Sequence, residues 1–286
     1  MRLDLMYGNL PTKISCLCLF LLLFAGCSDE ISKESYASET VIDDLADKIT
    51  WRKDGKEMVL IPAGSFEMGD HLDGMSRALP VHTVTLDAFY MDTHEVTVGQ
   101  FKQFLQSAGH KNTKPIDWDL IDECSPTDKH PMVYVSWHDA VAYAAWAGKR
   151  LPTEAEWEKA ALWNNDKKEK TIFPWGNEPP TDEHANVLES YNWNCTEIGS
   201  YPKGASSYGC HQMIGDVWEF TSSEFVGYPG FKSKFNEYND KWFTNQKVLR
   251  GGSFATPAIS IRGTYRNFFR LDERWLTSGF RCAKDF

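Results

Sequence analysis

From position 172 to the C-terminus the chain has few long periodic segments, and Gly, Pro and Trp recur between short apolar stretches. A doubly wound sheet would need strands that alternate with long helices, and a repeat array would need self-similar units. The sequence shows neither pattern. With 286 residues, of which 42% are hydrophobic, it still has enough apolar material for a sizeable core. We therefore expect an α+β domain in which much irregular structure is attached to a small sheet.

Strand patterns are concentrated before position 172. Residues 58–69 predict two short strands around a Pro-Ala-Gly turn. Apolar and polar residues alternate over 81–92, which predicts a half-buried strand. The charged run 164–170 is most simply a solvated loop.

Helix signals predict three short helices in the same part of the chain. Thr97 can cap the first helix. Ser136 stands at capping distance before the second, which Gly148 should end. Thr153 opens a capping box for the third helix, which we expect to run through Ala161.

The N-terminus has the pattern of an export signal. Arg2 and Lys13 precede an apolar run at 17–26, which is too short to span a membrane and is typical of a signal peptide. Small residues just before Cys27 resemble a lipobox, so we predict that Cys27 is acylated after removal of residues 1–26. An ordinary cleaved signal peptide with an incidental cysteine is the alternative.

The predicted organisation is a signal peptide at 1–26, a tether at 27–56 and one domain at 57–286. Residues 28–47 are polar and acidic with little apolar periodicity, which is typical of a flexible tether. The protein is thus expected in the cell envelope, held to the membrane by lipid and facing the periplasm or the cell exterior. A formal net charge of -10 argues against nucleic acid as a partner, because such binding needs a basic surface.

Cysteine usage leaves the redox state of the domain open. After removal of the signal peptide and acylation of Cys27, four cysteines remain: Cys124, Cys195, Cys210 and Cys282. Export permits disulfides, and four cysteines allow three full pairings, among which the sequence does not choose. No C-x-x-C pair occurs, which argues against a zinc site or a thioredoxin-type site.

Eight phrases in a fixed order carry a family resemblance. They are 61–64 with 68–69, 87–92 with 95–97, 131–137, 150–158, 173–176, 215–221, 249–254 and 279–283. Together they resemble the sulfatase-modifying factor family, founded by the formylglycine-generating enzymes. The resemblance covers about 57–286 and implies a C-type-lectin-like α+β fold with a surface groove.

A narrower resemblance is carried by 209–213, 228–231, 255–257 and 264–269. These stretches are similar to the C-terminal domain of ergothioneine-type sulfoxide synthases, which bind non-haem iron through three histidines that include an H-x-x-x-H-x-E motif. No such motif occurs in this chain.

The copper chemistry of the family can be tested on two positions. Formylglycine-generating enzymes hold Cu(I) between two thiolates, because a soft ion prefers sulfur ligands. The matching positions here are Thr256 and Ile261, which offer a hydroxyl and an alkyl group. We therefore expect no copper, no catalytic residue at these positions and no working cysteine oxidase. The resemblance also implies a bridge from Cys282 to the position of Ala161, so that bridge is absent or rewired.

Ligand candidates lie near the C-terminus and in the Trp-Glu motif. They are Arg262, Arg266, Asn267 and Trp218. Because guanidinium groups can hold carboxylates bidentately, we expect a small anionic ligand or a protein partner in the groove. The alternative is that the arginines pair with Asp and Glu of the same chain and that Trp218 belongs to the core.

A structural Ca2+ is a further implication of the resemblance. Oxygen ligands suit this ion, and the matching positions are Asn186, the carbonyl of Val187, and Asp216. A simple Asx turn is the alternative reading.

Two functions follow from these expectations. The first is an envelope lipoprotein that binds a ligand or a protein through its groove without catalysis. The second is a metal-dependent oxidoreductase of altered chemistry, related to the formylglycine-generating enzymes or the sulfoxide synthases. Metal content separates them, because only the second requires a redox metal.

Overall fold

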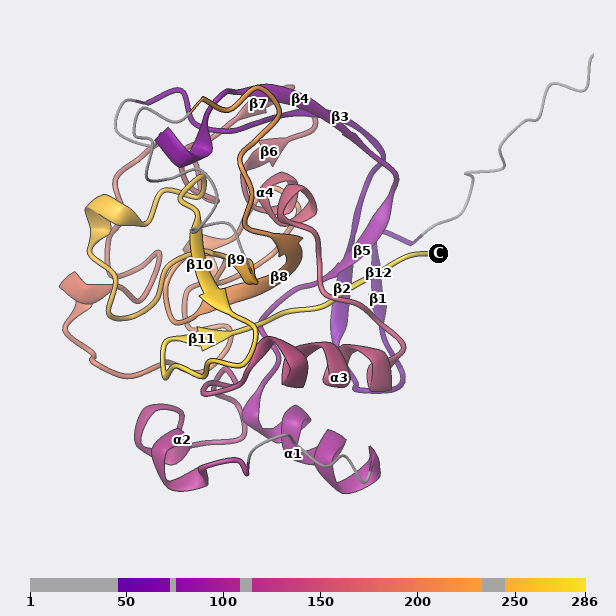
Figure 1. Ribbon diagram of the computed structural model, residues 1–286, viewed down its shortest axis with the longest axis vertical. Coiled ribbons are helices and arrows are strands. Elements are labelled where there is room, and N and C mark those ends of the chain that lie inside the picture. The colour runs from indigo at the N-terminus through magenta and orange to yellow at the C-terminus, as the bar shows by residue number, and fades with distance from the viewer. Residues whose placement is uncertain (1–45, 73–75, 109–114, 233–244) are drawn as a thin grey trace, which may run out of the picture. The chain divides into compact units, whose positions relative to one another are not determined.

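The computed structural model describes residues 46–72, 76–108, 115–232 and 245–286 (Figure 1). These residues belong to one compact unit, Asp44–Phe286. The predicted signal peptide, Cys27 and the tether up to residue 45 lie outside the described residues. Within the described part, no helix is both long and apolar enough to cross a membrane.

Helices and short strands alternate with long irregular connections. The α-helices are α1 (Val98–Ala108), α2 (Trp118–Cys124), α3 (Trp137–Ala147) and α4 (Glu154–Leu162). The strands are β1 (Lys48–Thr50), β2 (Glu57–Ile61), β3 (Gly64–Met68), β4 (His82–Leu86), β5 (Phe89–Asp92), β6 (Trp163–Asn164), β7 (Glu169–Lys170), β8 (Trp218–Glu224), β9 (Gln246–Arg250), β10 (Asn267–Arg270), β11 (Ser278–Gly279) and β12 (Ala283–Lys284). The predicted α+β class with small sheets is confirmed.

Two four-stranded sheets organise the domain, one in the order β1-β2-β5-β12 and the other in the order β10-β9-β8-β11. The first sheet joins the two ends of the described chain, because Ala283 of β12 pairs with Met91 of β5 (Figure 1). Two ribbons, β3-β4 and β6-β7, complete the strand pairing. In Figure 1, α1, α2 and α3 gather at one end of the sheets, whereas α4 lies beside β8.

The helix predictions are confirmed at their caps. The Thr97 hydroxyl accepts a hydrogen bond from the amide of Gln100 (3.3 Å). Ser136 and Thr153 both form reciprocal capping boxes, and α3 stops at Gly148 in the left-handed conformation (φ 70°). Such caps act within a few residues of each helix, so they could be read from the sequence.

Two strand predictions were wrong in detail. The stretch 81–92 forms two strands, because β4 pairs with β3 whereas β5 pairs with β2 and β12. The charged run 164–170 is the β6-β7 hairpin rather than a plain loop. Lys170 closes this hairpin and reaches inward to Glu158 (Nζ–Oε1 3.4 Å), so part of the charged run is structural.

The domain begins earlier than predicted. Residues 48–50, expected in the tether, form β1, in which Ile49 pairs with Met58 of β2. Asp54 is 5% exposed, and its carboxylate accepts a hydrogen bond from the ammonium of Lys149 (2.8 Å). The same ammonium donates to Asp92 (2.7 Å). The end of the predicted tether is therefore fixed by buried ion pairs, whose partners lie far along the chain.

Among the described residues the core has three hydrophobic clusters, and the two larger ones join distant segments. In the first, Tyr143 of α3 stacks on Phe101 of α1, with ring centroids 6.1 Å apart, and meets Phe280 edge-on. In the second, Trp157 of α4 is fully buried and donates its indole N–H to the carboxylate of Glu219 on β8 (2.9 Å). The first cluster thus joins α1 and α3 to the segment between β11 and β12, and the second joins α4 to β8.

Candidate functional site

A glycine turn after β9 lies between Thr256 and Ile261, the two positions that the resemblance assigns to copper ligands. Gly251 and Gly252 both have positive φ (99° and 83°). A Cβ atom at Gly252 would lie 2.9 Å from Ile261 Cγ2 and 3.7 Å from Thr256 Cβ. Both side chains thus flank the same glycine. A larger residue at Gly252 would be strained by its backbone conformation and would collide with Ile261.

Neither position carries a metal ligand for Cu(I). The Thr256 hydroxyl accepts from the amide of Ser253 (2.9 Å) and lies 3.0 Å from the Ser253 hydroxyl. Ile261 is fully buried in the cluster around Trp157. A hydroxyl already engaged by the backbone and an alkyl side chain do not fit Cu(I), which requires soft sulfur ligands.

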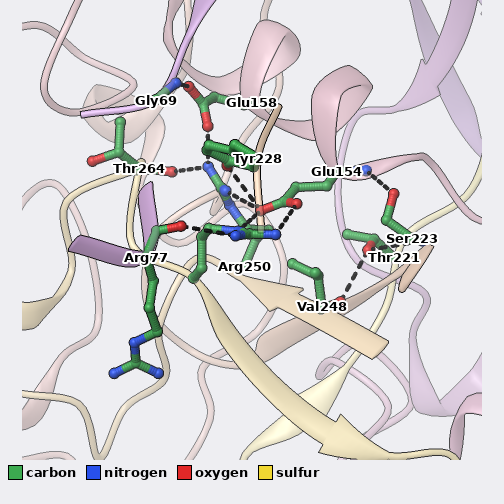
Figure 2. Close-up of polar contacts among 12 residues, drawn as sticks. Gly69, Arg77, Glu154, Glu158, Thr221, Ser223, Tyr228, Val248, Arg250 and Thr264 are labelled. Carbon is green, nitrogen blue, oxygen red and sulfur yellow. Dashed lines mark hydrogen bonds and ion pairs between the residues drawn. The ribbon is translucent and has the colours of Figure 1, made fainter. Parts of the chain in front are cut away.

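Three of the C-terminal arginines are used inside the protein. Figure 2 shows the carboxylates of Glu154 and Glu158, both from α4, turned toward Arg250 of β9. Arg250 donates to Glu154 (2.7 Å), to Glu158 (2.6 Å) and to the carbonyl of Gly263 (2.6 Å), and it is fully buried. Burial opposes ionisation of Glu154, but the charges of Arg266 and Arg250 outweigh it and hold its pKa below the ordinary value.

Arg266, one of the predicted ligand residues, belongs to the same network. Its guanidinium donates twice to Glu154 (2.6 and 2.9 Å) and once each to the carbonyls of Arg77 and Val226. Only 3% of the residue is exposed. Arg266 is therefore poorly suited to bind a ligand, because four of its N–H bonds already have acceptors in the protein. Arg281 is likewise buried, bidentate on Glu219 (2.7 and 2.7 Å).

Arg262 differs from these arginines in its surroundings. It lines a cavity of about 570 Å³ between the β6-β7 hairpin, the end of β3 and the loop after Ile261. The cavity wall includes Gly69, Asp70, His71, Trp163, Lys168, Lys170, Asn177 and Thr264. Several of these residues were not singled out from the sequence, because they come from three separate segments and no local pattern connects them.

The polar groups of this cavity are only partly satisfied by one another. Arg262 Nη2 lies 3.2 Å from Asp70 Oδ2, an oxygen that also accepts from the Thr264 hydroxyl (2.6 Å). The Nε of Arg262 is buried without a hydrogen-bond partner among the described residues. The Arg262 side chain is 20% exposed, and a planar guanidinium that is accessible at a cavity wall can bind a carboxylate. Lys168 and Lys170 carry positive charge at the same wall, where Glu67, Asp70 and Glu169 carry negative charge.

The other two ligand candidates lie elsewhere. Trp218 begins β8, is 6% exposed and packs near Tyr265 with ring centroids 5.9 Å apart. Asn267 begins β10, and its side chain accepts from the amide of Phe268 (2.9 Å). Neither residue lines the cavity of Arg262. The structure therefore gathers one of the four predicted ligand residues at this cavity.

The predicted calcium residues do meet, but around hydrogen-bond donors. Asp216 accepts from the Asn186 side chain (2.9 Å), from Gln212 (2.8 Å), and from both the amide and the hydroxyl of Thr196 (2.7 and 3.0 Å). The Val187 carbonyl accepts from the amide of Ser190 (2.9 Å). Ca2+ needs oxygen ligands free of such donors, so this arrangement does not fit the ion. Calcium stays a prediction without support from this geometry.

Glu95 is a buried carboxyl group without hydrogen-bond partners. It is fully buried, neither carboxyl oxygen has a partner among the described residues, and Arg281 Nη2 is 3.9 Å away. Burial, only partly offset by the charge of Arg281, raises the pKa of Glu95 well above its ordinary value. The folded state therefore holds the proton of Glu95 at a pH where the unfolded chain has released it.

Stability should fall with rising pH because of Glu95. Between its ordinary pKa and its raised folded pKa, the unfolded state binds fewer protons, so unfolding becomes easier by up to about 1.4 kcal/mol per pH unit. Glu95→Gln removes this titration. Urea unfolding from pH 4.5 to 8 should show that the variant gains stability over the wild type as pH rises. The exposed Glu178→Gln should change nothing, and a difference independent of pH would contradict the argument.

The two small sheets, the helices with their capping boxes and the glycine turn define a fold of the formylglycine-generating-enzyme class. The chain belongs to the family described as "Sulfatase-modifying factor enzyme 1-like domain", whose model matches residues 46–286. It is 36% identical to the hercynine oxygenase of Mycobacterium tuberculosis over 234 residues, which cover 72% of this chain and 55% of that protein. It is 30% identical to the formylglycine-generating enzyme of Mus musculus over 283 residues, which cover 80% of this chain and 75% of that enzyme.

Solved structures agree with this assignment. PvdO from Pseudomonas aeruginosa superposes with a TM-score of 0.65 and 26% identity, covering 84% of this chain and 98% of PvdO. CarF, with a TM-score of 0.58 and 18% identity over 82% of this chain and 99% of its own, shares the fold. The chain spans 55% of the length of the mycobacterial hercynine oxygenase. The predicted family and fold are thus confirmed.

Proposed function

We propose that this protein binds a small carboxylate-bearing ligand in the cavity of Arg262 and is not a cysteine oxidase. The observation that carries the proposal is the contrast between neighbouring positions. Ile261 is buried at a position that the resemblance assigns to a copper thiolate, whereas the next residue, Arg262, lines a cavity and has a side chain that is 20% exposed. A chain without thiolates at these positions keeps a site for binding but lacks the metal ligands for oxidation.

Arg262→Lys should weaken the binding of a carboxylate probe by roughly 10-fold or more, because lysine keeps the charge but loses the planar fork. Hercynine is a suitable probe, because it carries a carboxylate and because a related protein is called hercynine oxygenase. Glutarate provides a second probe without an imidazole ring. Calorimetric titration of wild type and variant measures the difference.

The matched control for this titration is Arg270→Ala, whose side chain is 65% exposed and lies away from the cavity. It should leave both affinities unchanged. Equal binding of the probes by Arg262→Lys and wild type would contradict the proposal, as would a lack of binding of both probes to the wild type at millimolar concentration. Circular dichroism verifies that each variant is folded.

A redox function remains the alternative, favoured by the identity to a hercynine oxygenase. It requires a redox metal held by other ligands. Among the described residues, no group of three or more His, Cys, Asp and Glu side chains is arranged to hold one. Elemental analysis of the protein purified without chelator distinguishes the two functions. Iron or copper at stoichiometric amount would favour oxidation, whereas calcium or no metal would favour binding.

We also propose that the protein acts at a membrane, anchored by an acylated Cys27. The apolar run and the small residues before Cys27 support this proposal. Cys27→Ser should move most of the protein from the membrane fraction to the soluble fraction after cell lysis. Ser28→Ala, one residue along, is the control and should remain with the membrane. Unmodified Cys27 in the mass spectrum of the mature protein would contradict the anchor.

A further inference from the structure

Cys124 and Cys195 meet in the interior although 71 positions separate them. Their sulfur atoms are 3.6 Å apart, and the two residues are 3% and 5% exposed. The amide of Cys195 donates to the carbonyl of Cys124 (3.1 Å), which holds the two backbones together. Within the described ranges, this is the one pair of cysteines whose sulfur atoms are in contact.

The other two described cysteines have different surroundings. Cys210 is fully buried, and its amide donates to the hydroxyl of Ser206 (3.3 Å). Cys282 is buried too, and its amide donates to the carboxylate of Asp92 (3.0 Å). No contact between either sulfur and another cysteine occurs among the residues that the structure describes. Only one of the three full pairings that the sequence left open joins Cys124 to Cys195, and of that pairing the structure favours this bond alone.

We propose that Cys124 and Cys195 form a disulfide that cross-links the end of α2 to the loop carrying Thr196. A disulfide needs its sulfur atoms at about 2.05 Å, so the two sulfurs must approach by a side-chain adjustment. The backbone hydrogen bond shows that the main chains are already close. Formation of this disulfide does not depend on a ligand in the cavity of Arg262 or on a metal near Thr256 and Ile261.

The bond forms by thiol–disulfide exchange with a disulfide donor such as oxidised glutathione. The thiolate of Cys124 attacks one donor sulfur and expels the first glutathione thiolate. The thiolate of Cys195 then attacks the sulfur of Cys124 in the mixed disulfide and expels the second. Two cysteine thiols thus lose two protons and two electrons, and the donor disulfide becomes two thiols. In the folded protein the hydrogen bond from Cys195 lowers the pKa of the Cys124 thiol.

The cross-link would stabilise the loop that holds Asp216. Thr196, next to Cys195, donates both its amide and its hydroxyl to Asp216. Because a long loop is closed by the bond, the unfolded chain loses much of its freedom. Reduction should therefore lower the melting temperature by roughly 5–15 °C.

The test uses the full chain refolded from denaturant in a glutathione redox buffer. Free thiols are alkylated in denaturant, and peptides are identified by mass spectrometry. We expect a linked peptide pair containing Cys124 and Cys195, with Cys210 and Cys282 alkylated. Dithiothreitol should lower the melting temperature of the wild type and of Cys210→Ala by the same amount.

The double variant Cys124→Ala/Cys195→Ala separates the bond from simple packing. Its melting temperature should not respond to dithiothreitol. Complete alkylation of Cys124 and Cys195 after oxidative refolding would overturn the proposal, as would a link from either of them to any other cysteine. A response of the double variant equal to that of the wild type would overturn it as well.

Discussion

Replacing Arg250 with alanine should destabilise the domain by about 3–5 kcal/mol, the largest effect we expect from a single substitution. Arg250 is fully buried and joins α4 to β9 through ion pairs with Glu154 and Glu158 (Figure 2). Removing one partner of a buried pair leaves the other charge desolvated. Glu158 would keep only the amide of Gly69 (2.8 Å) and Lys170 at 3.4 Å.

Thermal and urea unfolding measure this loss. The melting temperature should fall by roughly 6–20 °C for a domain of this size. Arg250→Lys should lower the melting temperature less than Arg250→Ala, because lysine keeps the positive charge. Some loss should remain, because lysine contacts fewer acceptors than arginine. Arg270→Ala is the matched control, since its side chain is 65% exposed and lies 3.9 Å from Asp272. Exposed pairs of this kind contribute about 0–1 kcal/mol. Equal effects at Arg250 and Arg270 would show that the buried network is not stabilising.

Introducing two thiols should give the protein a copper affinity that we do not expect of the wild type. We expect Thr256→Cys/Ile261→Cys to retain a stoichiometric amount of Cu(I) against a competing chelator, and the wild type to retain none. The reason is geometric: both side chains flank Gly252, so two thiolates there would lie beside the same glycine. Cu(I) prefers such soft ligands.

The single variants Thr256→Cys and Ile261→Cys are the controls, and neither should retain copper. Because Ile261 is fully buried, circular dichroism must show that each variant is folded. The wild type, supplied with Cu(I), O2 and a sulfatase-type C-x-P-x-R peptide, should form no aldehyde by mass spectrometry. Aldehyde formation by the wild type, or equal copper retention by the single variants, would contradict our interpretation of Thr256 and Ile261.

Local features of the fold could be predicted from the sequence. The caps of α3 and α4 at Ser136 and Thr153 act over three residues, so their spacing alone identified them. Gly148 ends α3 for the same local reason. The family and the absence of thiols at Thr256 and Ile261 were also accessible, because both depend on residue identities in order along the chain.

Pairing between distant segments was decided by the tertiary structure. The stretch 81–92 has one alternating pattern, yet its halves join different sheets, because strand partners are chosen by segments far away. The arginines illustrate the same limit. Arg250 and Arg262 have the same side chain, but Arg250 finds Glu154, 96 positions away, whereas Arg262 meets a cavity. Sequence determined which charges and thiols the chain carries, and only folding decided which of them are neutralised by a buried partner and which can meet a ligand.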